Sequence, residues 1–226
     1  IMAGATCPIE VMRRVISEMH MGEVQIAYGM TETSPVSMQT GPDDDLELRV
    51  TTVGRTQPQL ENKLIDAEGN IVARGEIGEL CTRGYSVMLG YWNNPQASRE
   101  AIDSEGWMHT GDLAEMNEQG YVRIVGRNKD MIIRGGENIY PRELEEFFFT
   151  HPAVADVQIV GIPDEKYGEE IVAWIKFHPG HTANELELQA WCKSRVAHFK
   201  TPRHFKFVEA FPMTVTKKKK KFKMRE

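Results

Sequence analysis

The stretch from Gly126 to Glu145, GRNKDMIIRGGENIYPRELE, decides how this chain is divided. Its first residues form a polar run that is too hydrophilic for a buried strand, so we expect that run to be exposed. A short apolar strand over 131–133 follows, and then Gly135 and Gly136, whose backbones can adopt positive φ or approach another segment closely. After Pro141 the apolar residues take up helical spacing. The order of loop, strand, glycine pair and helix predicts a joint between two domains.

The composition is that of a globular protein with a substantial core. The chain has 226 residues, 41% of them hydrophobic, and a net charge of −6. This acidic balance argues against a general nucleic-acid binder, although basic residues crowd into 217–225. No apolar run reaches the ~20 residues that a membrane-spanning helix needs, so we expect no transmembrane segment.

The cysteine usage indicates a reducing compartment, such as the cytoplasm. Cys7, Cys81 and Cys192 are odd in number and far apart in the sequence. Neither a disulfide framework nor a zinc site is suggested by this spacing. We therefore expect the cysteines to be buried structural residues.

Residues 1–45 are typical of an α/β domain. An amphipathic helix is predicted after Pro8, with one apolar face formed by Val11, Val15, Ile16 and Met19. A buried strand over 23–27 should lead into the polar loop YGMTET, residues 28–33. Open α/β sheets bind ligands at such strand ends, whereas the alternative is an ordinary surface turn.

Residues 46–126 change to short strands separated by Gly, Pro, Asn and Asp, with 95–102 as one short helix. This pattern predicts a small antiparallel β-barrel or sheet. Within it, the motif WMHTGDL at 107–113 places Asp112 in a tight turn. Such an aspartate either caps the local backbone or accepts hydrogen bonds from a pair of ribose hydroxyls.

Residues 132–226 are predicted to form a compact α+β domain. Strands over 154–161 and 168–177 should pair, and a helix over 186–196 and a strand over 205–208 should follow. The predicted organisation is therefore a domain over 1–126, which is the tail end of a large α/β domain with its β-barrel subdomain. A hinge over 127–131 then leads to a mobile C-terminal α+β domain over 132–226.

Four motifs occur in one order: YGMTET at 28–33, GELCTRGYSVMLG at 78–90, TGDL at 110–113 and the stretch 126–145. Together they resemble the adenylate-forming, AMP-forming acyl-CoA synthetase family. Tyr91, Trp92 and the stretch 126–145 are most similar to medium-chain fatty-acyl-CoA ligases. The resemblance implies that the chain is the C-terminal two-fifths of such an enzyme, with the phosphate loop and most of the acyl pocket upstream of Ile1.

The resemblance also implies a two-step reaction on a fatty acid. The carboxylate attacks the α-phosphate of ATP to give an acyl-adenylate and pyrophosphate, and the thiol of coenzyme A then displaces AMP. Because phosphoryl transfer is catalysed largely by positioning and charge neutralisation, cations for phosphate and acids for Mg²⁺ are expected. There are two alternatives to this ligase function: an adenylating enzyme that loads a carrier protein, and an inactive nucleotide-binding module.

Most of the implied site residues precede the joint. Those near the nucleotide base are Gly4, Ala5 and Thr6 along the adenine, Tyr28 stacked on it, and Gly29 and Met30 in the following loop. Thr31 resembles the phosphate-contacting hydroxyl, and Glu32 the carboxylate that holds Mg²⁺. Asp112 resembles the ribose-binding acid, with Ile124 as an apolar wall and Arg127 reaching ribose or phosphate.

The remaining implied residues belong to the joint and to the C-terminal part. Lys129 lies at the hinge position, and Gly135 and Gly136 match the strand that lines the pantetheine tunnel. Lys218 occupies the position of the catalytic lysine, but Lys217 replaces the glycine that normally precedes it. The alternative for the run 217–221 is a solvated basic tail.

Overall fold

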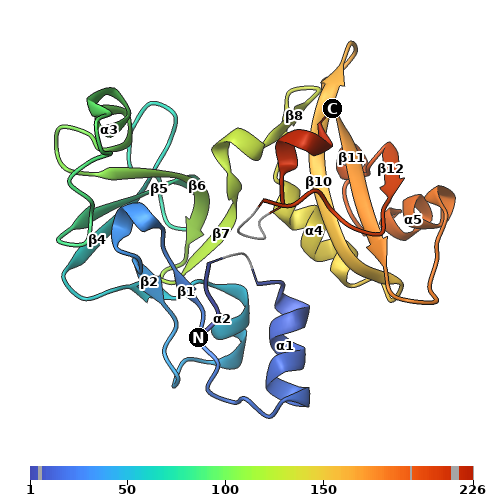
Figure 1. Cartoon of the computed structure of the whole chain (residues 1–226), viewed down its shortest axis with the longest axis horizontal. Coiled ribbons are helices and arrows are strands. Elements are labelled where there is room, and N and C mark those ends of the chain that lie inside the picture. The colour runs from blue at the N-terminus through green and yellow to red at the C-terminus, as the bar shows by residue number, and fades with distance from the viewer. Residues whose placement is uncertain (5–6, 194, 215–218, 226) are drawn as a thin grey trace. The chain divides into compact units, whose positions relative to one another are not determined.

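The computed structural model describes residues 1–4, 7–193, 195–214 and 219–225. The chain divides into two compact units, Ile1–Asn128 and Lys129–Glu226. Figure 1 shows helices and strands in both units. No helix in the described ranges is long and apolar enough to cross a membrane.

The first unit begins with short elements. These are α1 (Ile9–Glu18), β1 (Ala27–Tyr28), a 3₁₀ turn (Thr31–Thr33), β2 (Met38–Gln39), α2 (Leu46–Thr51) and β3 (Arg55–Thr56). The three strands form an antiparallel sheet in the order β1-β2-β3. The strand expected over 23–27 is thus shorter and later than predicted. A helix, α2, also occupies residues where only strands were expected.

Helix α1 buries only part of the face that was predicted: Val15 and Ile16 pack in the core as expected, whereas the other two residues do not. Met12 is fully buried, and Ile9, Val15 and Ile16 pack around it. Val11 and Met19 were expected on the buried face but are 38% and 66% exposed. Residues 9, 12 and 16 follow the i, i+3, i+7 spacing of a helix stripe, which explains the choice of face.

The rest of the first unit is a four-stranded antiparallel sheet. Its strands are β4 (Leu60–Ile65), β5 (Ile77–Gly84), β6 (Met108–Met116) and β7 (Val122–Arg127), in the order β4-β5-β6-β7. The predicted short helix is α3 (Pro95–Ala101), with Asn94 as its N-cap. A mixed fold with an antiparallel sheet is therefore confirmed.

The predicted β-barrel is corrected to an open sheet within the described residues. Strand β7 does not pair with β4 there. Its first residue, Val122, instead exchanges hydrogen bonds with Val53 and Gly54, at 2.8 and 3.0 Å. Because that segment takes the edge that closure would need, the sheet stays open. Its buried side packs as one cluster: Met38, Val53, Leu64, Leu80, Ala114, Met116 and Val122.

The second unit is an α+β domain. Its elements are β8 (Ile132–Arg134), β9 (Glu137–Ile139), α4 (Pro141–Phe149), β10 (Val154–Asp164), β11 (Gly168–Phe177), α5 (Glu185–Cys192) and β12 (His204–Phe207). The sheet order is β10-β11-β8-β9, and β12 pairs with β11 in parallel. The predicted pairing of the two long strands is confirmed. Strand β9 was not expected, and α5 ends at Cys192 rather than near Val196.

Helix α4 is anchored in the core of this unit. Pro141 stands in its first turn, where proline costs no hydrogen bond. Leu144 and Phe148 are fully buried, and the ring of Phe148 meets that of Phe205 edge to face at 6.2 Å. Burying one such aromatic side chain contributes roughly 1.5–3 kcal/mol.

Candidate active site

Two neighbouring strands bring an acid and a base together at the end of the first unit. Asp112 on β6 lies opposite Arg127 on β7 in the strand register. The Arg127 Nε donates a hydrogen bond to Asp112 Oδ1 at 3.0 Å. The Asp112 side chain is only 12% exposed, whereas that of Arg127 is 57% exposed. The carboxylate is therefore held in place by a cation that still reaches solvent.

Tyr28 joins this pair from the distant strand β1. Its hydroxyl donates a hydrogen bond to Asp112 Oδ2 at 2.6 Å. Burial, reinforced by the nearby Asp112 charge, raises the pKa of Tyr28 far above its ordinary value. Tyr28 thus stays a neutral donor at every physiological pH. Because a carboxylate has about four acceptor positions, Asp112 can accept further bonds beyond these two.

The turn that presents Asp112 depends on the residues before it. Gly111 has a φ of +69°, which glycine tolerates far better than other residues. The Thr110 Oγ1 donates to the Leu80 carbonyl at 2.6 Å and accepts from the Asp112 amide at 3.1 Å. The motif TGDL therefore sets the position of the carboxylate through its own backbone.

The loop after β1 carries Glu32, which is half-buried, and Thr31, which is exposed. Glu32 Oε1 accepts a hydrogen bond from the Tyr91 hydroxyl at 2.8 Å, and this bond is the main cause of the raised pKa of Tyr91. The Glu32 carbonyl accepts from the Met88 amide at 2.8 Å. The chain region 88–91 therefore orients Glu32. Sequence reasoning did not assign Tyr91 this role.

The same loop is tightly folded around Gly29. A Cβ atom at Gly29 would lie 1.7 Å from the Pro35 carbonyl oxygen, so no larger residue fits without a backbone shift. The Met30 amide donates to Thr33 Oγ1 at 3.2 Å. These contacts fix the path of the backbone between Tyr28 and Glu32.

The structure describes only some of the remaining site residues that were predicted in the first unit. Ile124 and Tyr28 both pack against the apolar cluster of the four-stranded sheet. Gly4 is exposed with a φ of +84° and follows Met2, which bridges Ile26 in parallel. Ala5 and Thr6 lie outside the described residues, as does Lys218 of the second unit.

Lys129 begins the second unit, within a 3₁₀ turn over Asn128–Asp130. Its side chain is exposed, and its carbonyl accepts a hydrogen bond from Arg225 Nη2 at 3.2 Å. Arg225 also pairs with Asp130 at 3.4 Å. The C-terminal end of the chain is therefore fastened to the start of the second unit.

Gly135 and Gly136 form the two-residue turn between β8 and β9, not part of a strand. Their φ values are +61° and +86°, the left-handed conformation that tight hairpins require. A Cβ on Gly136 would meet no atom within 4 Å, so in this unit backbone conformation rather than crowding favours glycine there. The Gly135 amide donates to the Tyr167 carbonyl at 2.8 Å, which holds the turn against the end of β10 and the start of β11.

Two lysines of the basic C-terminal run form ion pairs within the second unit, which a solvated tail would not do. Lys219 Nζ lies 2.6 Å from Asp156, and Lys221 Nζ lies 3.1 Å from Glu145. Both lysine side chains are only 24% exposed. These two ion pairs hold the segment that follows Lys218 against β10 and α4.

Comparison with known proteins agrees with the motifs. The family model described as AMP-binding enzyme matches residues 1–92, and that described as AMP-binding enzyme C-terminal domain matches residues 143–218. The chain belongs to the AMP-binding enzyme family, that is, to the adenylate-forming acyl-CoA synthetases.

Its curated relatives narrow the class further. It is 54% identical over its whole length to YngI of Bacillus subtilis (strain 168), which carries a provisional acyl-CoA synthetase name. It is 49% identical to the mitochondrial medium-chain acyl-CoA ligase ACSF2 of Rattus norvegicus, again over its whole length. The chain spans 41% and 37% of the length of these two relatives.

A solved structure shows the same fold. ATP-bound MatB from Rhodopseudomonas palustris matches 99% of this chain with a TM-score of 0.92 and 31% identity. The match covers 44% of that chain. The antiparallel sheets described above are therefore those of an adenylate-forming enzyme.

Proposed function

We propose that the protein containing this chain is an ATP-dependent ligase that activates a medium-chain fatty acid, first to the acyl-adenylate and then to acyl-CoA. The single observation that carries the proposal is the meeting of Tyr28, Asp112 and Arg127, three residues far apart in the sequence that the family resemblance links to nucleotide binding. The similarity to medium-chain acyl-CoA ligases supports the choice of substrate.

The first unit would hold the nucleotide. Asp112 accepts hydrogen bonds from the ribose hydroxyls, and its existing bonds to Tyr28 and Arg127 keep the carboxylate in position for them. The ring of Tyr28 and the side chain of Ile124 offer apolar surfaces to the base. Arg127 bonds Asp112 through Nε while its side chain is 57% exposed, so its terminal nitrogens would reach phosphate, for which the forked guanidinium is suited.

Glu32 fits the requirement for a Mg²⁺ ligand. It supplies a hard carboxylate, and Tyr91 orients one of its oxygens. Bound Mg²⁺ would neutralise charge on the ATP phosphates during adenylation. Thr31 adds a hydroxyl donor beside it, and Lys218 would bring a mobile positive charge to the carboxylate and the α-phosphate.

The second unit would serve thioester formation. Gly135 and Gly136 would lie along the pantetheine arm of coenzyme A, where side chains would narrow the path. Lys129 would be the pivot, because one rigid site cannot easily present the acyl group first to a lysine and then to a thiol.

The test uses the full-length protein with a panel of fatty acids. Pyrophosphate release should depend on ATP and acid, and acyl-CoA should form once coenzyme A is added. Failure of every acid to release pyrophosphate would refute the ligase assignment. Release without acyl-CoA would refute the choice of acceptor and point to a carrier protein instead.

The variant Lys218→Ala separates the two half-reactions. It should suppress pyrophosphate release much more than the conversion of supplied acyl-adenylate to acyl-CoA. Lys223→Ala, a lysine from the same basic segment, is the control. Equal loss in both half-reactions would contradict the role of Lys218.

A further inference from the structure

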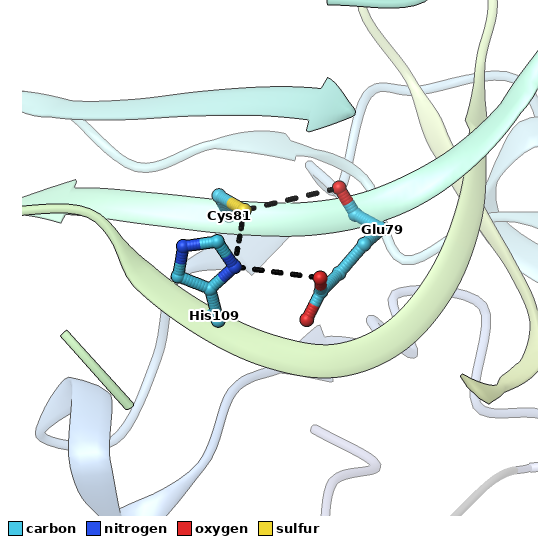
Figure 2. A group of neighbouring side chains, drawn as sticks. All are labelled: Glu79, Cys81 and His109. Carbon is cyan, nitrogen blue, oxygen red and sulfur yellow. Dashed lines mark hydrogen bonds and ion pairs between the residues drawn. The ribbon is translucent and has the colours of Figure 1, made fainter. Parts of the chain in front are cut away.

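One group of metal-ligating side chains lies outside the site just described. Glu79 and Cys81 are two residues apart on β5, so their side chains share one face of the strand. His109 on β6 lies directly opposite Cys81 in the strand register. Figure 2 shows the three side chains converging between the two strands.

The distances from the imidazole nitrogen to the other two ligand atoms suit one small cation, and all three ligand atoms lie within 4.8 Å of one another. His109 Nδ1 lies 3.7 Å from Cys81 Sγ and 3.4 Å from Glu79 Oε2. A tetrahedral zinc ion with ordinary bond lengths separates a sulfur and a nitrogen by about 3.5 Å, and a nitrogen and an oxygen by about 3.4 Å. The nitrogen–oxygen contact is longer than an ordinary hydrogen bond of about 2.7–3.2 Å, whereas the nitrogen–sulfur contact has a length that a thiol hydrogen bond also reaches.

The two carboxylate oxygens of Glu79 contact different groups. Oε1 accepts a hydrogen bond from the Gly111 amide at 3.0 Å, which fixes the carboxylate. Oε2 is the oxygen that faces the imidazole of His109. The carboxylate is therefore already oriented to offer one oxygen to a cation.

The surroundings resemble those of protein zinc sites. Asp103 Oδ2 lies 3.7 Å from His109 Nε2, on the opposite side of the ring from the candidate site. At this distance the carboxylate does not hydrogen-bond the ring, but its negative charge favours a cation bound at the other ring nitrogen. Ile65 and Trp107 pack with the fully buried Cys81 and form an apolar wall beside the sulfur.

Charge and access are also compatible with a divalent cation. A thiolate and the Glu79 carboxylate would face the ion, and the Asp103 carboxylate adds negative charge on the far side of the His109 ring. Nearby cations include Lys63, which lies opposite Cys81 on β4, and Arg83, whose guanidinium lies 4.4 Å from the centroid of the Trp107 ring. Lys63 places its ammonium over the ring of Trp107, at 4.4 Å. The side chains of His109 and Glu79 are 31% and 20% exposed, which provides an entry path.

We propose that Glu79, Cys81 and His109 form a binding site for a thiophilic divalent cation, with Zn²⁺ as the best fit, and that a water molecule completes its coordination. A set of one sulfur, one nitrogen and one oxygen favours Zn²⁺ over Mg²⁺, which prefers oxygen ligands alone. The site is distinct from the Mg²⁺ position proposed at Glu32.

Co²⁺ is the probe for the experiment, because a thiolate ligand gives it a charge-transfer absorption that histidine and carboxylate ligands do not. The purified, untagged protein should show this band with one equivalent of Co²⁺, and Zn²⁺ should displace it. The variant Cys81→Ser should lose the band. Cys7→Ser and Cys192→Ser are the matched controls and should keep it.

Two further variants test metal binding without changing the buried Cys81, whose substitution could also impair folding. His109→Gln, at a partly exposed position, should weaken Zn²⁺ binding by at least about tenfold while leaving the melting temperature of the metal-free protein unchanged. Asp103→Asn should weaken it to a smaller extent, by about two- to fivefold, through the loss of a nearby negative charge. Absence of the band in the unmodified protein, its survival in Cys81→Ser, or unchanged Zn²⁺ affinity in His109→Gln would each overturn the proposal.

Discussion

Among single residues, Asp112 has the most contacts that bear on the proposed chemistry. It accepts hydrogen bonds from Tyr28 and Arg127 while sitting almost fully inside the first unit. Its negative charge explains why both donors point toward it, because charge-assisted hydrogen bonds are about twice as strong as neutral ones.

Replacing this carboxylate should mainly damage nucleotide use. In Asp112→Asn the amide cannot accept from both donors and the ribose as the carboxylate can, so kcat/KM for ATP in pyrophosphate release should fall about 10- to 100-fold. This range corresponds to the ~1.5–3 kcal/mol of a hydrogen bond to a charged group. Glu115→Gln breaks the exposed pair with Arg123 on the same two strands and is the control. Similar losses in both variants would show that Asp112 acts through sheet stability alone.

Cys192 predicts a pH effect on stability. Burial raises the pKa of its thiol from about 9.0 to about 11. The unfolded chain therefore loses this proton at lower pH than the folded chain does. Stability from this thiol is fully present below pH 9 and is lost as the pH rises through 11, by about 1–3 kcal/mol.

The measurement is the free energy of urea unfolding between pH 8 and pH 11 for the unmodified protein and for Cys192→Ala. The variant should lose less stability over this interval, whatever its stability at pH 8. Parallel pH curves for the two proteins would contradict the assignment. Cys7→Ala, at a partly exposed position, is the control.

At the scale of elements, the hairpin β8–β9 shows how a local sequence sets a turn. Two consecutive glycines with positive φ produce the twist that joins two antiparallel strands. Arg134, the last residue of β8, donates to the buried Glu170 at 2.9 Å and so ties the hairpin to β11. This contact and the Gly135–Tyr167 hydrogen bond attach the hairpin to the rest of the second unit.

Gly136→Ala should strain this turn, because an alanine in the left-handed region costs about 1–2 kcal/mol. Urea unfolding followed by tryptophan fluorescence measures the loss. Gly136→Asn is the matched control and should lose less, since asparagine tolerates this conformation better. Equal destabilisation by alanine and asparagine would exclude backbone conformation as the cause.

At the scale of the whole molecule, the chain consists of two units that meet in sequence at Asn128 and Lys129. Each unit has its own buried cluster and its own sheet. A boundary at Lys129 is compatible with the proposed pivot, because few backbone torsions at a domain boundary can produce a large rotation.

Proline at the pivot tests this role. Lys129→Pro fixes one backbone torsion and removes an amide donor, so it should slow one half-reaction by at least about tenfold and leave the other nearly unchanged. Pyrophosphate release and thioester formation from supplied acyl-adenylate are measured separately. Lys129→Ala keeps the backbone free and should affect neither. Unimpaired half-reactions in the proline variant would reduce the segment to a simple linker.

Sequence alone determined the features that depend on neighbouring residues. The paired strands β10 and β11 and helices α3 and α4 follow from local spacing and turn chemistry, whereas the hairpin turn at the glycine pair was not predicted. The motifs around Tyr28 and Asp112 were enough to indicate the family, because four of them occur in one order. Predictions from local patterns were wrong where tertiary packing selects one of several possible structures. Examples are part of the buried face of α1 and the sheet that remains open.

Only the tertiary structure decided which distant residues meet. Tyr28 and Asp112 are 84 positions apart, and their hydrogen bond depends on how β1 packs beside β6. Cys81 and His109 face each other because of the register of β5 and β6, which shifts at a β-bulge between Glu79 and Cys81. A shift of one residue would turn each side chain to the opposite face of the sheet. Sequence spacing cannot supply that register, which is why the cysteines showed no metal site until the strands were paired.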